Sequence, residues 1–259
     1  MTPASMLENR SAANGTTPAK IEGPAGPHSA PTSAGANMVT APVLSTRALE
    51  ERRLIHRQDS ARAQADAFRD LRTRLLAISG SRNFVVLVAS VSNGCGGSFV
   101  ARNLALAFAF DESKAAVLVD CDALHPSQHT ALGVAPSAGG LMDYLDGSVT
   151  ESQDIRYATG VARLQLIPNG SHRETAGEHF SSARARAMIE SLRNGSQDRF
   201  VILDAPPVLN SPDARILSDL ADMVVLVAGY GKVTLESIDK AAANFEPAKL
   251  AGIVFNELG

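Results

Sequence analysis

Hydrophobic positions along this chain form two patterns, which together predict alternating strands and helices. Between residues 60 and 78, apolar side chains recur every three or four positions, which predicts an amphipathic helix. Elsewhere the apolar residues form continuous runs rich in β-branched side chains, which predict buried strands. The predicted strands are residues 84–90, 115–120, 164–167, 200–204, 223–228 and 252–255. Further helices are expected from residue 97 to about 109, at 181–194, and from near Pro212 and Thr234.

This order of elements predicts an α/β fold class. Continuous apolar strands that alternate with helices are typical of a doubly wound, mostly parallel sheet with helices on both faces. Because crossover connections are right-handed, the functional site of such a sheet is expected at the carboxyl ends of its strands.

The first part of the chain has a different composition. Residues 1 to about 45 are rich in Ala, Pro, Gly, Ser and Thr, and such a segment buries too little apolar surface to offset its ordering entropy. We predict a disordered tail over residues 1–58 and a single folded domain over 59–259. A docking role of the tail for a partner remains an alternative.

Charge and cysteine content narrow the function classes. The formal net charge is −3 and no basic block is present, so nucleic-acid binding has little support. Cys95 and Cys121 stand at no metal-ligand spacing, which is typical of free thiols in a reducing compartment. No apolar run reaches the roughly 20 residues of a membrane span, and no signal peptide is recognisable. We expect a cytoplasmic protein, and any membrane association must come through a partner.

A glycine-rich loop follows the first predicted strand. Residues 90–98 read S-V-S-N-G-C-G-G-S and approximate the phosphate-binding pattern G-x-x-x-x-G-K-[ST]. Gly94 and Gly96 allow the backbone to curl so that its N–H groups face an anion, and the next helix adds its positive end. Ser98 stands at the position of the Mg²⁺-binding hydroxyl. Gly97 stands where the pattern has lysine.

The missing lysine changes the expected chemistry. Its ammonium neutralises the β- and γ-phosphates and the charge of the transition state. A buried charge without its partner costs about 3–5 kcal/mol, which is about two to three decades in affinity. Arg102, one turn into the next helix, or an arginine of a neighbouring subunit could substitute. Without other signals, the loop would read equally well as an ordinary strand-to-helix turn.

Carboxylates end two of the predicted strands. Asp120 and Asp122 follow the second strand, and Asp204 ends the strand at 200–204. Side chains at such strand ends face the same crevice as the loop, where they can hold Mg²⁺ and orient an attacking hydroxyl. A single aspartate there would more often cap the next turn, but three favour a nucleotide site.

These motifs resemble the bacterial polysaccharide tyrosine autokinases (BY-kinases), relatives of the MinD/ParA ATPases. Residues 93–99, N-G-C-G-G-S-F, stand where the family has P-G-E-G-K-S-T. Residues 120–129, D-C-D-A-L-H-P-S-Q-H, are similar to D-A-D-L-R-R-P-x-x-H, without its two arginines. Residues 203–208, L-D-A-P-P-V, are similar to the D-T-P-P Walker B motif. The resemblance covers about residues 60–257 and implies a P-loop NTPase fold.

The resemblance also implies a set of site residues, with ATP and Mg²⁺ as cofactors. Asp120, Asp122 and Asp204 would be catalytic, and Ser98, Asp122 and Asp204 would hold the metal. The nucleotide would contact Gly94, Cys95, Gly96, Gly97, Ser98, Phe99 and, at its adenine, Asn256. A helix similar to the E-x-x-R-x-x-R ring helix would form oligomers through Asp66, Arg69 and Arg72. The implied partner is an inner-membrane polysaccharide co-polymerase, or chain-length protein.

The departures favour a degenerate member of this family. The lysine and the two arginines are absent, and Tyr144, Tyr157 and Tyr230 form no tyrosine cluster. We expect a pseudokinase-like, oligomeric exopolysaccharide or capsule biosynthesis subunit with weak ATP binding. The alternatives are an active tyrosine autokinase or ATPase with a substitute cation, and a MinD/ParA-type positioning ATPase. A metal site at His125 and His129, and a redox switch at the two cysteines, are weaker hypotheses.

Overall fold

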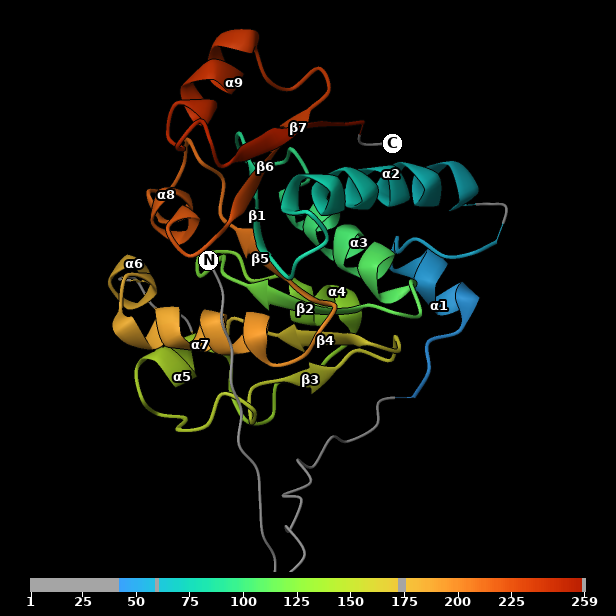
Figure 1. The fold of residues 1–259 in the computed structure, drawn as a ribbon, viewed down its shortest axis with the longest axis vertical. Helices are drawn as coiled ribbons and strands as arrows, with labels where there is room; N and C mark the ends of the chain where they lie inside the picture. The colour runs from blue at the N-terminus through green and yellow to red at the C-terminus, as the bar shows by residue number, and fades with distance from the viewer. Residues whose placement is uncertain (1–41, 59–60, 172–175, 258–259) are drawn as a thin grey trace, which may run out of the picture. The chain divides into compact units, whose positions relative to one another are not determined.

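A seven-stranded sheet lies at the centre of the described structure, in the order β3-β4-β2-β5-β1-β6-β7 (Figure 1). Its strands are β1 Val85–Ser90, β2 Ala115–Asp120, β3 Tyr157–Ala158, β4 Leu164–Ile167, β5 Arg199–Ala205, β6 Met223–Gly229 and β7 Leu250–Asn256. All pairs are parallel except β3 with β4, which is antiparallel. From β1 the chain continues to β2, β3 and β4 on one side of the sheet. It then returns through β5 to β6 and β7 on the other side, as in a doubly wound sheet.

The structure is a computed structural model, and it describes residues 42–58, 61–171 and 176–257. Residues 1–41 of the predicted tail lie outside the described residues. The helices are α1 Thr46–Glu51, α2 Arg62–Ser79, α3 Gly97–Ala109, α4 Gln128–Leu132, α5 Leu141–Leu145, α6 Ala176–Phe180, α7 Ala183–Asn194, α8 Asp213–Ser218 and α9 Leu235–Ala242.

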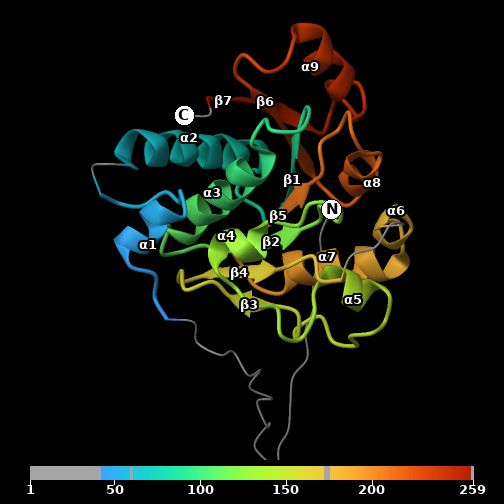
Figure 2. The same ribbon diagram turned by 180° about the vertical axis from the view of Figure 1, so that it is seen from behind.

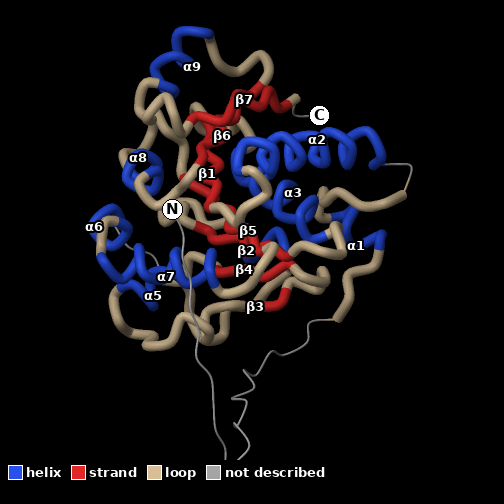
Figure 3. The backbone as a smooth tube through the Cα atoms, viewed as in Figure 1, coloured by secondary structure: helices blue, strands red, loops and turns tan. Residues whose placement is uncertain are grey.

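Helices cover both faces of the sheet, and each face has its own hydrophobic core. Along β1, Val85, Leu87 and Ala89 point into one core, whereas Val86 and Val88 point into the other, as the two-residue period of a strand requires. The first core is covered by α5 to α9 and the second by α1, α2 and α3. Figures 1 and 2 show these two layers from opposite sides, and Figure 3 separates the strands from the helices by colour. The predicted fold class is confirmed.

Residues 42–58, part of the predicted tail, are described and pack against the domain. α1 lies within residues 42–58, and Leu49, Leu54 and Ile55 are buried against the second core. The fully buried Asn103 of α3 holds this segment, because its Oδ1 accepts a hydrogen bond from the Ile55 N–H at 2.8 Å. Its amide nitrogen donates to the Arg53 carbonyl at 3.3 Å. These apolar side chains and this buried amide explain why the segment packs against the domain.

One property bears on membrane association. Among the described residues, no helix is both long and apolar enough to pass through a bilayer.

Candidate nucleotide-binding site

Three adjacent strands bring the predicted carboxylates together. β5 lies between β1 and β2, and Asp120 of β2 is the direct register partner of Asp204 of β5. Both side chains are fully buried, and Asp122 is nearly so. The structure therefore places all three aspartates at the carboxyl edge of the sheet, beside the loop that leaves β1.

The loop between β1 and α3 has the curled backbone that its glycines predict. Gly94 and Gly96 adopt positive φ angles of 74° and 86°, and α3 begins at Gly97. A cleft of about 630 Å³ opens above the loop. Its lining includes Asn93, Gly94, Gly96, Gly97, Ser98, Phe99, Arg102, Asp122 and His125. Loop amides, a helix N-terminus and a carboxylate thus share one cleft, as a phosphate-binding site requires.

The carboxylates lie in an environment that disfavours their charged forms. Burial, with a further contribution from Asp204, raises the pKa of Asp120 to about 8, although backbone N–H groups of Ser127 and Gln128 donate to it. Burial raises the pKa of Asp204 to about 7, against hydrogen bonds from Gln128 and Ser98. Two buried carboxyl groups on neighbouring strands therefore resist being ionised together.

The oxygen atoms at this edge fit a magnesium ion. Ser98 donates to Asp204, and Asp204 Oδ1 is buried without a hydrogen-bond partner among the described residues. Asp122 uses Oδ1 to accept from the N–H groups of Leu124 and His125, at 3.1 and 2.9 Å. Mg²⁺ prefers few protein carboxylates, a hydroxyl and several waters. Within the described ranges no three His, Cys, Asp or Glu side chains form a metal cage, so the ion would need nucleotide or water oxygens as well.

The cationic side chain that reaches the cleft is Arg102. Its guanidinium lies 5.8 Å from the centre of the Phe99 ring. Burial lowers the pKa of Arg102, while Asp204 and Asp120 oppose that effect. Arg102 thus lies close enough to the buried aspartates to interact with them electrostatically, as a substitute cation would.

Two contacts to the outside of the loop were missed by sequence reasoning. Lys232, in the turn after β6, donates from Nζ to the Gly94 carbonyl at 3.2 Å. Asn256, predicted to contact adenine, donates from Nδ2 to the Cys95 carbonyl at 3.0 Å. Both hold carbonyl groups of the loop and leave its N–H groups for a ligand. A lysine between two apolar segments carries no sequence signal for such a contact.

The structure also shows where the two histidines and the two cysteines lie. His125 lines the cleft, and no metal cluster forms around it or His129 within the described ranges. Cys95 and Cys121 are free and buried, and burial, together with the nearby Asp120, raises the pKa of the Cys121 thiol. A thiol with a raised pKa forms little reactive thiolate.

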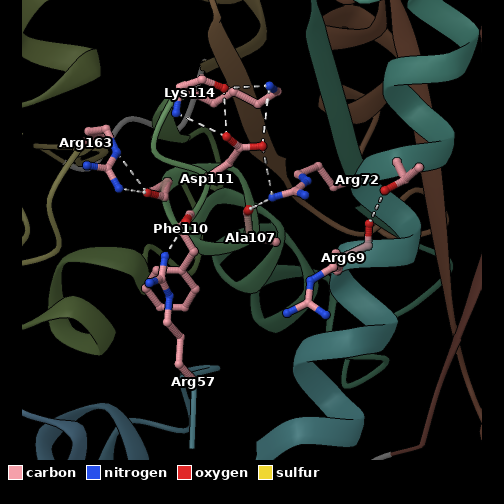
Figure 4. Close-up of polar contacts among 11 residues, drawn as sticks. Arg57, Arg69, Arg72, Ala107, Phe110, Asp111, Lys114 and Arg163 are labelled. Carbon is pink, nitrogen blue, oxygen red and sulfur yellow. Dashed lines mark hydrogen bonds and ion pairs between the residues drawn. The ribbon is translucent and has the colours of Figure 1, made fainter.

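The predicted oligomerisation residues separate into two environments on α2. Arg69 pairs with Asp66 at 2.5 Å, and the two side chains are 63% and 50% exposed. Arg72 is only 16% exposed, because it donates to the Ala107 carbonyl at 2.7 Å and faces Asp111 at 3.7 Å. Figure 4 shows Arg72 turned toward the end of α3.

The carboxyl end of α3 is capped by guanidinium groups from three segments. Besides Arg72, Arg57 donates to the Phe110 carbonyl at 2.6 Å, and Arg163 donates to the Ala109 carbonyl at 3.0 and 3.2 Å. Cations at a helix C-terminus satisfy its free carbonyls and stabilise its dipole. Arg72 therefore stabilises the helix that begins at the glycine-rich loop.

Fold and site together define a P-loop α/β protein of the nucleotide-binding class. No protein-family model matches the chain. The tyrosine-protein kinase CpsD of Streptococcus agalactiae is 28% identical to it over 200 residues, which are 76% of this chain and 85% of CpsD.

Solved structures agree with this relationship. The tyrosine kinase domain of BceF has a TM-score of 0.68 at 25% identity, covering 85% of this chain and 92% of that domain. The cell-division ATPase MinD of Pyrococcus furiosus has a TM-score of 0.57 at 24% identity, over 68% of this chain and 72% of MinD, a likeness of fold alone. The homologues of this chain are bacterial tyrosine-protein kinases, and the resemblance inferred from its motifs is confirmed.

Proposed function

We propose that this protein is a degenerate, tyrosine-autokinase-like subunit that regulates the assembly or export of an exopolysaccharide or capsule. It acts through binding and oligomerisation, together with an inner-membrane chain-length partner. The observation that carries the proposal is Gly97, which starts α3 at the point where a P-loop presents its lysine. The homology to tyrosine-protein kinases supports the class of protein. The polysaccharide, the partner and a peripheral location at the inner membrane rest on the motif resemblance.

The cleft supports a weak nucleotide site in this proposal. When bound, Mg²⁺ would neutralise phosphate charge, and Ser98, Asp122 and Asp204 supply the oxygen atoms to hold it. The loop amides from Gly94 onward would accept the phosphates, and Asn256 lies beside the loop for the adenine end. Asp120 and Asp204 hold protons readily because of their raised pKa values. The site thus binds and orients a triphosphate better than it stabilises its transfer.

An active kinase or ATPase is the second candidate, because Arg102 lines the cleft beside the aspartates. An arginine held over Phe99 is a fixed cation, and guanidinium groups bind phosphate oxygens in pairs. A MinD/ParA-type positioning ATPase shares the fold, but no contact in the described part of the chain favours it over the other two.

Calorimetric titration of the unaltered protein with Mg-ATP separates these candidates. We expect a Kd near the millimolar range, since the missing cation costs about two to three decades. Phosphotyrosine detection after incubation with Mg-ATP is expected to show no product. Micromolar binding with phosphotyrosine formation would instead establish the active kinase, and Arg102→Met would then abolish it.

The oligomerisation helix gives an independent prediction. Replacing Arg69 with glutamate places like charges beside Asp66 on an exposed face, so we expect the dissociation constant of the oligomer to rise at least about tenfold. Light scattering during size-exclusion chromatography measures the change. Arg74→Glu is the matched control, because Arg74 forms a similar exposed pair with Asp70 on α2. A monomeric wild-type protein, or equal loss in both variants, contradicts the ring contact.

A further inference from the structure

Gln128 connects the three motifs of the site, although it stands at a variable position of the second motif. It is the first residue of α4 and is fully buried. Its amide nitrogen donates to Asp204 Oδ2 at 2.5 Å and to the Ser98 carbonyl at 3.0 Å. Its backbone N–H donates to Asp120 Oδ2 at 3.0 Å. One residue therefore holds both buried aspartates and the first turn of the P-loop helix.

The hydrogen bond to Asp204 occupies a place that matters for metal binding. Asp204 has two oxygens that could face a cation, and the amide of Gln128 uses one of them. Its other oxygen, Oδ1, and the Oε1 of Gln128 are both buried without a hydrogen-bond partner among the described residues. Buried acceptors without donors are costly, so the site is incompletely satisfied around this bond.

A cation would normally offset the charge of such a carboxyl pair. Here residue 97 is glycine, so the loop lacks the lysine of a P-loop. Arg102 lines the cleft, but among the described residues it forms no ion pair with Asp204 within 4 Å. The amide N–H of Gln128 carries a partial positive charge and lies in direct contact with Asp204. Together with the hydroxyl of Ser98, it stabilises this carboxyl group in the absence of metal.

We propose that Gln128 is a positioning residue that takes over part of the role of a cation at Asp204, so that the site keeps its structure without Mg²⁺ and binds the free ion weakly. This inference rests on the proposed function, because it concerns the weak binding of Mg²⁺ in the same cleft. Gln128 is then a second cause of that weak binding, besides Gly97. The amide of Gln128 already occupies Oδ2 of Asp204, which leaves Oδ1 as the oxygen of that carboxylate that could hold an ion.

Replacement of Gln128 by glutamate tests this directly, because the shape is kept and the donor becomes a carboxylate. Two carboxylates in contact repel each other, so in EDTA at pH 8 we expect the Tm to fall by roughly 5–10 °C. Addition of MgCl₂ to about 10 mM is expected to restore most of the loss, since a divalent cation would offset the charge of the two carboxylates. The wild-type Tm should change by less than about 2 °C under the same addition.

Two controls make the result specific. Gln64→Glu introduces the same charge on the exposed face of α2 and should leave the Tm insensitive to Mg²⁺. Gln128→Met removes the donor without adding charge, and we expect the Kd for MgCl₂, measured without nucleotide, to decrease about tenfold. The Met variant decides the question if the Glu variant does not fold.

The proposal is overturned if the wild-type protein binds MgCl₂ as tightly as Gln128→Met, or gains as much stability from it as Gln128→Glu. These experiments are done without nucleotide, so they test the role of Gln128 alone. The proposed function would instead fail through tight Mg-ATP binding and phosphotyrosine formation.

Discussion

Replacement of Gly97 by lysine is expected to tighten Mg-ATP binding by about two to three decades, from the millimolar toward the micromolar range. The other parts of the cradle are in place: Gly94 and Gly96 curl the loop, and α3 begins directly after it. An ammonium at position 97 would supply the missing counter-charge for the β- and γ-phosphates. Calorimetric titration with Mg-ATP, at one ionic strength for all variants, measures the effect.

The structure shows how the variant can be accommodated. A Cβ atom at residue 97 would lie 3.1 Å from the Ser90 Cβ and 3.2 Å from the Ser90 backbone nitrogen, so the end of β1 has to shift by a few tenths of an ångström. Gly97→Ala introduces that strain without the charge and is the matched control. We expect Gly97→Ala to bind Mg-ATP no more tightly than the wild-type protein. Equal affinity of the Ala and Lys variants would show that charge at this position is not what limits binding.

The central elements of the fold could be predicted because they carry local signals. The strands β1, β2, β5 and β6 are continuous apolar runs, and their observed bounds differ from the predicted ones by at most one residue. The short elements could not be predicted this way. β3 has two residues and α4, α5 and α6 have five each, too few for a hydrophobic period to develop. Such segments acquire their structure from tertiary contacts.

The site residues also include some that the sequence could predict and some that it could not. Asp120 and Asp204 could be placed at one edge from their strand-end positions, and β2 and β5 indeed pair there. Gln128 and Lys232 could not be found, because their contacts join positions far apart in the chain, 76 residues for Gln128 with Asp204 and 138 for Lys232 with Gly94. Arg72 shows the converse: its spacing on α2 suits a surface contact, but a free carbonyl of α3 lies within its reach.

The free energy of unfolding of the metal-free protein is expected to fall as the pH rises from 6 to 9. Asp120 and Asp204 have pKa values of about 8 and about 7 in the folded protein, raised by burial from 3.8. Between these limits the folded state binds more protons than the unfolded state, so stability is greatest at low pH and is lost as the pH rises through 7 and 8. We expect a loss of roughly 2 kcal/mol or more, since each proton contributes about 1.4 kcal/mol per pH unit.

Urea denaturation in EDTA at pH 6, 7.5 and 9 measures this slope, and Asp204→Asn identifies its source. The amide keeps the shape of the carboxyl group but has no charge to bury, so we expect the variant to be more stable than the wild-type protein at pH 9 and to show a flatter pH profile. Asp111→Asn is the control, because its ion pairs with Arg72 and Lys114, 3.7 and 3.4 Å long, lie away from the cleft. Burial acts to raise the pKa of Asp111, but hydrogen bonds from Ser113, with Lys114 and Arg72, outweigh it and lower that pKa. Asp111 therefore titrates below this range, and its loss should leave the slope unchanged. A wild-type stability that rises with pH, or a slope that survives Asp204→Asn, would mean that the buried carboxyl pair is already ionised at neutral pH. In that case the cleft would hold its charges ready for Mg²⁺.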